Sequence, residues 1–166
     1  MPAELEQLRE ATERMLAELT RVTDAQWSIR TAPDQWSVAQ VAEHVAISNR
    51  NICRMLMKRL LVSPLGDRTT DVTDAEIPYL FYRGDEPPDV AAPTGDWMKA
   101  HAAQELDASA RAIVEWAQGA NTDLRSVGIA HPVFGLLDGI QWLLFAAAHT
   151  ERHRAQILGL RRHWEG

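Results

Sequence analysis

The chain has 166 residues, of which 46% are hydrophobic, so it is long enough to bury a core as a single domain over residues 1–166. Its formal net charge is −6 and it has no run of five or more basic residues, which argues against nucleic acid and an anionic membrane surface as partners. Cys53 is the only cysteine, which excludes an internal disulfide, and we see neither a signal peptide nor an apolar stretch of about 20 residues, so we expect a cytoplasmic protein.

The first predicted element is an amphipathic helix over about residues 3–22, where leucine, methionine and valine recur at helical spacing. The stretch 23–36 contains aspartate and proline and is typical of a connection. Trp27 and Trp36 flank this connection, and we expect both to pack beneath it.

A second helix should begin after Ser37, a good N-cap residue, and end before Pro64. The following stretch, 63–95, holds five prolines and three glycines, which exclude a long helix. A connection of this length in a compact domain is usually functional or a crossover between distant elements. Its apolar patch predicts that part of it docks on the body, with a short helical turn at 73–82.

The third helix is expected over about residues 95–118, followed by a loop of about 17 residues. The fourth helix should begin near Leu137 or Asp138 and end near Trp164. No run of residues convincingly predicts a strand. The pattern indicates an all-α protein, a four-helix bundle with one long crossover between its second and third helices, which permits the first two helices to pack as a pair against the last two.

Two histidines in the fourth helix are spaced for joint metal binding. His149 and His153 are four residues apart, which places both on one face of a helix, one turn apart. Each neutral imidazole offers a nitrogen lone pair to a metal ion. At about 100° per residue, Trp142, Phe145 and Leu160 lie within about 60° of His149. The pair is therefore on the apolar face, where two bases need a partner.

A metal site needs a third ligand from another helix. His163 also points inward but lies about 21 Å along the axis from His149. His101 is off the apolar stripe of its helix, as expected of a solvated histidine, and His131 precedes a proline in a loop, where it could cap or hydrogen-bond. His44 is left, and it could converge with the pair if the two helices run antiparallel or cross near their middles. Three histidines leave a tetrahedral ion one open position, which is typical of catalytic sites.

Other chemistries fit the sequence less well. The zincin motif needs glutamate directly after the first histidine, where this chain has Thr150, and no histidine has the glutamate three residues before it that di-iron bundles use. Cys53 is about 180° around its helix from His44, so a packing or surface position is expected for it. A histidine pair at this spacing can also face solvent or be an accident of packing, and this alternative stays open from the spacing alone.

Three blocks of the sequence resemble the DinB-like (DinB/YfiT) superfamily of metal-dependent enzymes, in order along nearly the whole chain. They are Trp36-Ser37-Val38-Ala39-Gln40-Val41-Ala42-Glu43-His44-Val45, then His131-Pro132-Val133-Phe134-Gly135 leading through Trp142, and finally His149-Thr150-Glu151-Arg152-His153-Arg154-Ala155-Gln156-Ile157. The resemblance implies a bundle of up-up-down-down order and one divalent metal ion held by His44, His149 and His153. Zinc or nickel is the usual ion, and iron or manganese also occurs. A homodimer is expected.

The resemblance implies a low-molecular-weight-thiol S-transferase, in which a thiol and an electrophilic small molecule are the partners. A zinc-type ion lowers the pKa of a bound thiol or water by several units, and Trp142, Phe145 and Met55 are expected to form apolar walls. The first alternative is a metal-dependent hydrolase, which would turn over without added thiol. The second is a metal-stabilised bundle without activity that serves as a binding or stress-response module.

Overall fold

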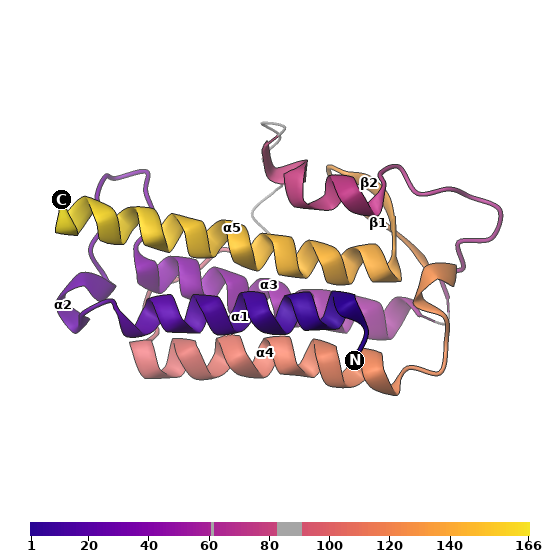
Figure 1. Cartoon of the computed structure of the whole chain (residues 1–166), viewed down its shortest axis with the longest axis horizontal. Helices are drawn as coiled ribbons and strands as arrows, with labels where there is room; N and C mark the ends of the chain where they lie inside the picture. The colour runs from indigo at the N-terminus through magenta and orange to yellow at the C-terminus, as the bar shows by residue number, and fades with distance from the viewer. Residues whose placement is uncertain (61, 83–90) are drawn as a thin grey trace.

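The computed structural model describes residues 1–60, 62–82 and 91–166. Four long helices form a bundle: α1 (Ala3–Thr20), α3 (Val38–Arg59), α4 (Lys99–Gly119) and α5 (Gly139–Glu165) (Figure 1). The short helix α2 (Asp24–Trp27) follows α1, and two 3-10 helices, η1 (Asp74–Tyr82) and η2 (Leu124–Ser126), lie in the later connections. The expected all-α four-helix bundle is confirmed.

The two helices that carry the candidate histidines begin at well-formed caps. The Ser37 hydroxyl accepts a hydrogen bond from the backbone N–H of Gln40, and the Asp138 carboxylate accepts one from the N–H of Gln141. Each glutamine side chain in turn accepts from the N–H of the cap residue. These capping boxes satisfy N–H groups that have no partner within the helix, so the start of α3 at Ser37 is confirmed.

The helix directions differ from the expected up-up-down-down order. The ion pairs Arg14–Glu151 and Glu18–Arg161 follow one another in the same direction along both helices, so α1 and α5 are parallel. Helices α3 and α4 are also parallel with each other, because Arg50 pairs with Glu105 and the next turn of both helices lines one groove. The chain colours of Figure 1 show that the two pairs run in opposite directions. The order is therefore up-down-down-up.

The connections explain this order. The short segment between α1 and α3 reverses the direction of the chain. The long crossover leads back to the end of the bundle at which α3 began, so α4 runs parallel to α3. Helices α1 and α3 each pack against both α4 and α5, so α1 and α3 are diagonal neighbours (Figure 1). The pairing of the first two helices that the crossover length permits is therefore not the one formed. The antiparallel packing of α3 and α5 meets one of the two conditions under which His44 could converge with the pair.

Part of the crossover docks on the bundle, as its apolar patch predicts. The helix η1 matches the turn expected at 73–82 and packs against α5. The side chains of Ile77 and Leu80 are fully buried there. Residues 83–90 of the predicted crossover lie outside the described residues.

A β-hairpin precedes α5, although no strand was expected. Strands β1 (Gly128–His131) and β2 (Gly135–Asp138) pair antiparallel, with His131 opposite Gly135. The ring Nδ1 of His131 accepts hydrogen bonds from the backbone N–H groups of Val133 and Phe134, and Gly135 has φ +81°. The hydrogen bonds to His131 and the left-handed Gly135 therefore stabilise the turn of the hairpin. Its strands are too short to show a periodic pattern in the sequence.

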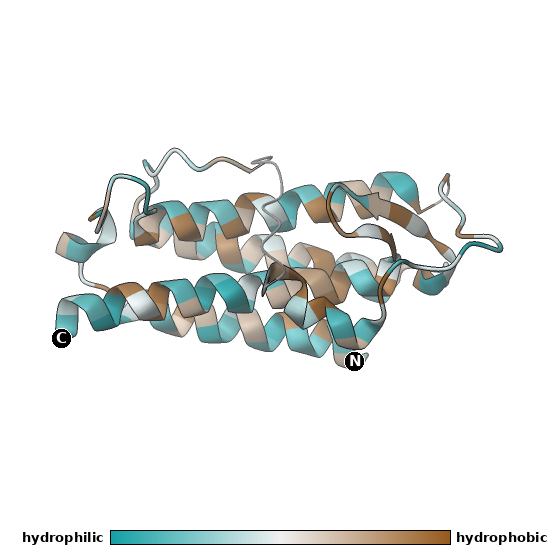
Figure 2. Ribbon diagram, turned by 90° about the horizontal axis from the view of Figure 1, so that it is seen from above, coloured by the Kyte–Doolittle hydropathy of each residue, from teal (hydrophilic) through white to brown (hydrophobic). Residues whose placement is uncertain are grey.

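Apolar side chains fill the bundle in two clusters. One lies around η1, the hairpin, the starts of α1 and α5 and the ends of α3 and α4. The other joins the end of α1, the first half of α3, the start of α4 and the end of α5. Hydrophobic and hydrophilic residues alternate around each long helix in Figure 2. None of the helices in the described part of the chain is long and apolar enough to cross a membrane.

Candidate metal centre

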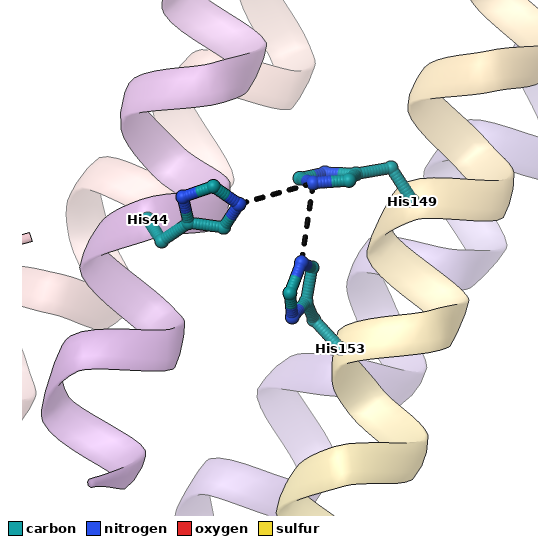
Figure 3. A group of neighbouring side chains, drawn as sticks. All are labelled: His44, His149 and His153. Atoms are coloured by element: carbon teal, nitrogen blue, oxygen red, sulfur yellow. Dashed lines mark hydrogen bonds between the residues drawn. The ribbon is translucent and has the colours of Figure 1, made fainter. Parts of the chain in front are cut away.

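Three histidine side chains meet between α3 and α5 (Figure 3). The Nε2 atom of His149 lies 3.1 Å from Nε2 of His44 and 3.1 Å from Nε2 of His153. The potential ligand atoms of the three residues all lie within 4.8 Å of one another. The structure thus brings together the three residues that the sequence analysis selected from six histidines.

The spacing of these nitrogens suits a tetrahedral metal ion. Zinc binds imidazole nitrogen at about 2.0–2.1 Å, which places two ligands of a tetrahedron about 3.3 Å apart. The two separations from His149, 3.1 Å each, are close to that value. The third pair, His44 and His153, has its potential ligand atoms within 4.8 Å of each other.

The outer nitrogens fix the ring tautomers. Nδ1 of His44 lies 2.9 Å from the carbonyl oxygen of Ala91, and Nδ1 of His153 lies 2.9 Å from Oε1 of Gln156. Both partners accept, so each Nδ1 carries the proton and donates it. The Nε2 atoms of His44 and His153 are then lone pairs directed at His149. Metal-binding histidines are commonly oriented by such outer hydrogen bonds.

His149 cannot satisfy both neighbours by itself. A proton on its Nε2 can be donated to only one of the two neighbouring Nε2 atoms, that of His44 or that of His153. Its Nδ1 is buried and makes no hydrogen bond within the described residues. A cation between the three rings would pair all three Nε2 lone pairs, so this donor set fits a metal ion.

Burial keeps the two histidines of α5 in the form that binds metals. Desolvation, with smaller effects from His153 and His44, holds the pKa of His149 well below its usual value of 6.5. Desolvation likewise lowers the pKa of His153 to about 3. Both rings are therefore neutral at neutral pH, and protons do not compete with a metal ion there.

Aromatic side chains surround the histidines. The ring of Phe145, an expected wall, stacks 5.9 Å from that of His149. Trp36 lies 4.8 Å from the ring of His44 and Phe81 lies 5.7 Å from that of His149. The sequence analysis missed both: Trp36 was expected beneath the first connection, yet it lies just before the N-cap Ser37 of α3, where its ring contacts that of His44.

Trp142 and Met55 are the two other expected walls. Trp142 packs against Phe145 and donates its indole N–H to the carbonyl of Ile129 in the hairpin. Met55 packs on the apolar cluster at the hairpin end of the bundle. Within the described residues Trp142 makes no ring contact with the three histidines, so it does not form the expected wall. The wall expected of Met55 stays a prediction.

Glu43 holds the end of the crossover against α3. Its carboxylate is buried and accepts hydrogen bonds from the N–H and hydroxyl of Thr94 and from the N–H of Gly95. These residues stand close in sequence to Ala91, whose carbonyl orients His44. The position next to His44 is the only sequence signal for this role, and the sequence analysis did not use it.

The remaining candidates lie away from the centre. His101 is exposed against Trp97, as expected of a solvated histidine. His163 is also exposed, which corrects the inward position predicted for it, because the apolar contacts of α5 end at Leu160 and at the half-buried Trp164. Cys53 is buried beside α4, where desolvation raises the pKa of its thiol.

The fold and the site define a class of protein: a helical bundle with a centre of three histidines from two antiparallel helices. The model of the DinB superfamily matches residues 7–157, so the chain belongs to the DinB superfamily. The fold is similar to that of YfiT from Bacillus subtilis, with a TM-score of 0.68 and 18% sequence identity over 98% of this chain and 86% of that one. YfiT is described as a probable metal-dependent hydrolase with an unusual four-helix bundle topology. No curated protein matches the chain.

Proposed function

We propose that this protein is a metal-dependent enzyme that transfers a low-molecular-weight thiol to an electrophilic small molecule. His44, His149 and His153 would hold one divalent ion. The observation that carries the proposal is the convergence of three Nε2 atoms, two of them held as lone pairs by hydrogen bonds at Nδ1. A purely structural histidine cluster has no need of this arrangement, which leaves bases facing one another in a buried site.

The donor set favours zinc or nickel. Imidazole nitrogen suits both ions, whereas manganese prefers carboxylate and carbonyl oxygen. Among the described residues, the cluster of potential ligands contains histidine alone. Iron remains the next candidate, because imidazole also suits it.

The side chains have distinct roles in the proposed reaction. A bound ion would supply Lewis acidity that lowers the pKa of a thiol or water at its open position. His44 and His153 are oriented by Ala91 and Gln156, so their ligand nitrogens are preorganised. Phe81 and Phe145 cover the ring of His149 and exclude water there. Cys53 is buried on another face of α3, so the nucleophile would be a free thiol.

Metal content and turnover test the proposal together. Untagged protein should contain one zinc or nickel ion per chain by elemental analysis. A panel of thiols and electrophiles should show turnover that is lost on chelation and restored by metal. The variant His149→Ala should lose both the ion and the activity, while His101→Ala, which removes an exposed histidine, should keep both. Stoichiometric metal in His149→Ala would refute the ligand assignment.

Hydrolysis is the second candidate, because YfiT is described as a probable metal-dependent hydrolase. The same metal-binding residues would serve, with water in place of the thiol. Metal-dependent turnover of ester or amide substrates without any thiol would favour hydrolysis. Inactivity of fully metallated protein across both panels would favour a non-catalytic module.

A further inference from the structure

Arg152 stands next to the histidine centre without being part of it. It is one residue before His153 on α5, and its Nη1 donates to the carbonyl oxygen of Phe81 at 3.0 Å. Its guanidinium carbon lies 5.2 Å from the centroid of the Phe81 ring, which itself lies 5.7 Å from that of His149. The cation is thus held over one wall of the site.

No carboxylate of the described residues forms an ion pair with Arg152, in contrast to its neighbours. Arg14 and Arg154 both pair with Glu151. Arg152 is exposed, and its only hydrogen bond within the described part of the chain uses Nη1. The edge formed by Nε and Nη2 is therefore available, and such an edge matches the two oxygens of a carboxylate.

The charges around the centre also call for an anion. Three neutral imidazoles leave a divalent ion with its full charge, and Arg152 adds another positive charge. Arg152 lies beside this charge, because the ring of Phe81 that its guanidinium covers also contacts the ring of His149. Within the described residues, two carboxylates near the centre are otherwise engaged: Glu43 accepts from Thr94 and Gly95, and Glu151 pairs with arginines. Excess buried charge is costly unless the ligand balances it.

We infer that Arg152 binds a carboxylate group of the small molecule that occupies the open position of the metal centre, an inference that rests on the proposed function. The ligand class is an anionic thiol or an anionic electrophile. Arg152 is then a specificity residue, because it favours a carboxylate over a neutral group of the same size.

Calorimetric titration of the zinc-loaded protein tests this inference with mercaptoacetate and mercaptoacetamide, which have almost the same size and differ in charge. The measured quantity is the ratio of their dissociation constants. The inference predicts that Arg152→Gln lowers the preference for mercaptoacetate by roughly 2- to 5-fold, the range for one exposed ion pair. Arg152→Lys should retain part of the preference, since it keeps the charge but loses the fork.

Arg162→Gln is the matched control. It removes the same charge from an exposed position of the same helix, about 15 Å farther along the axis. The control should leave the ratio as in the wild type. A comparison of turnover with iodoacetate and iodoacetamide, using one neutral thiol, shows whether Arg152 also acts on the electrophile.

The outcomes separate the inference from the proposed function. If Arg152→Gln leaves the ratio of the two dissociation constants unchanged, the inference is overturned. The preference for the carboxylate would then come from its direct chelation of zinc. If no protein binds either thiol, the thiol-transfer proposal fails. Binding of acetate and acetamide then tests Arg152 separately. A preference of the wild type for acetate that is lost in Arg152→Gln supports the inference. Equal preference in the wild type and Arg152→Gln contradicts it.

Discussion

The buried carboxylate of Glu43 ties Thr94 to helix α3 through both the backbone N–H and the hydroxyl of Thr94. This contact fixes the end of the crossover beside the candidate metal centre. Ala91, three residues before Thr94, gives its carbonyl oxygen to Nδ1 of His44. Glu43 therefore orients His44 indirectly, by holding the backbone that holds its ring.

Glu43→Gln is expected to weaken metal binding by about 10- to 100-fold, the usual cost of disturbing an outer hydrogen bond of a metal ligand. The amide has one acceptor oxygen where the carboxylate has two, so part of the tie to residues 94 and 95 is lost. Competition with a chromogenic chelator measures the affinity. Glu105→Gln, which breaks the ion pair of α4 with Arg50, is the control and should not change it. Equal affinities in the two variants would contradict the role of Glu43.

Gln156 should tune the affinity in both directions. Its Oε1 accepts the proton on Nδ1 of His153, so Gln156→Ala should weaken metal binding by about 10-fold or more. Gln156→Glu supplies a charged acceptor, makes the imidazole more basic and should strengthen binding at neutral pH. The same chelator competition distinguishes the two variants. Identical affinities in both would show that this hydrogen bond does not act on the ligand.

His131 should make the protein sensitive to acid. Burial lowers the pKa of His131 from 6.5 to about 4, so the unfolded chain binds more protons in that interval. The free energy of unfolding is therefore fully present above pH 6.5 and falls as the pH drops towards about 4. The contribution of His131 is at most about 3 kcal/mol, which corresponds to the size of this shift.

Urea unfolding of metal-free protein at several pH values measures this effect. His131→Asn keeps a side-chain oxygen that can accept the N–H groups of Val133 and Phe134 but does not titrate. Its stability should change less with pH than that of the wild type in the same interval. His149 and His153 titrate in both proteins with the same sign, so the difference isolates His131. Parallel stability curves would exclude its contribution.

Asn49 should be replaceable with a gain in stability. Its side chain is fully buried in α3, and neither amide atom has a hydrogen-bond partner within the described residues. Asn49→Leu keeps the size and removes the unpaired polar group, so we expect the free energy of unfolding to rise by about 1–3 kcal/mol. Thr12→Val is the comparison, because the Thr12 hydroxyl donates to the carbonyl of Leu8. A loss of stability in Asn49→Leu would show that the amide is satisfied in solution.

Local interactions explain which parts of the fold and site could be predicted. The start of α3 follows from the hydroxyl of Ser37, and the shared face of His149 and His153 follows from the helical repeat. His44 could be selected because the alternatives lay too far along an axis or off an apolar stripe. Metal binding by His44, His149 and His153 stays a prediction, since their geometry fits a metal ion but does not show one bound.

The errors have a common origin in contacts between distant segments. The side on which the chain returns decides helix order, and hydropathy does not encode it. The hairpin depends on one ring nitrogen, in His131, accepting two backbone N–H groups. Phe81 reaches His149 from η1, nearly seventy residues earlier in the chain, so no spacing within one helix could reveal it.

The sequence by itself determined the helices, their caps and the pair of histidines one turn apart, because each depends on residues within a few positions of one another. Only the tertiary structure decided what completes the centre: the antiparallel packing of α3 and α5, the carbonyl of Ala91 and the cover of Phe81. These depend on how the crossover docks, and docking is set by the sum of many weak contacts made by residues far apart in the chain.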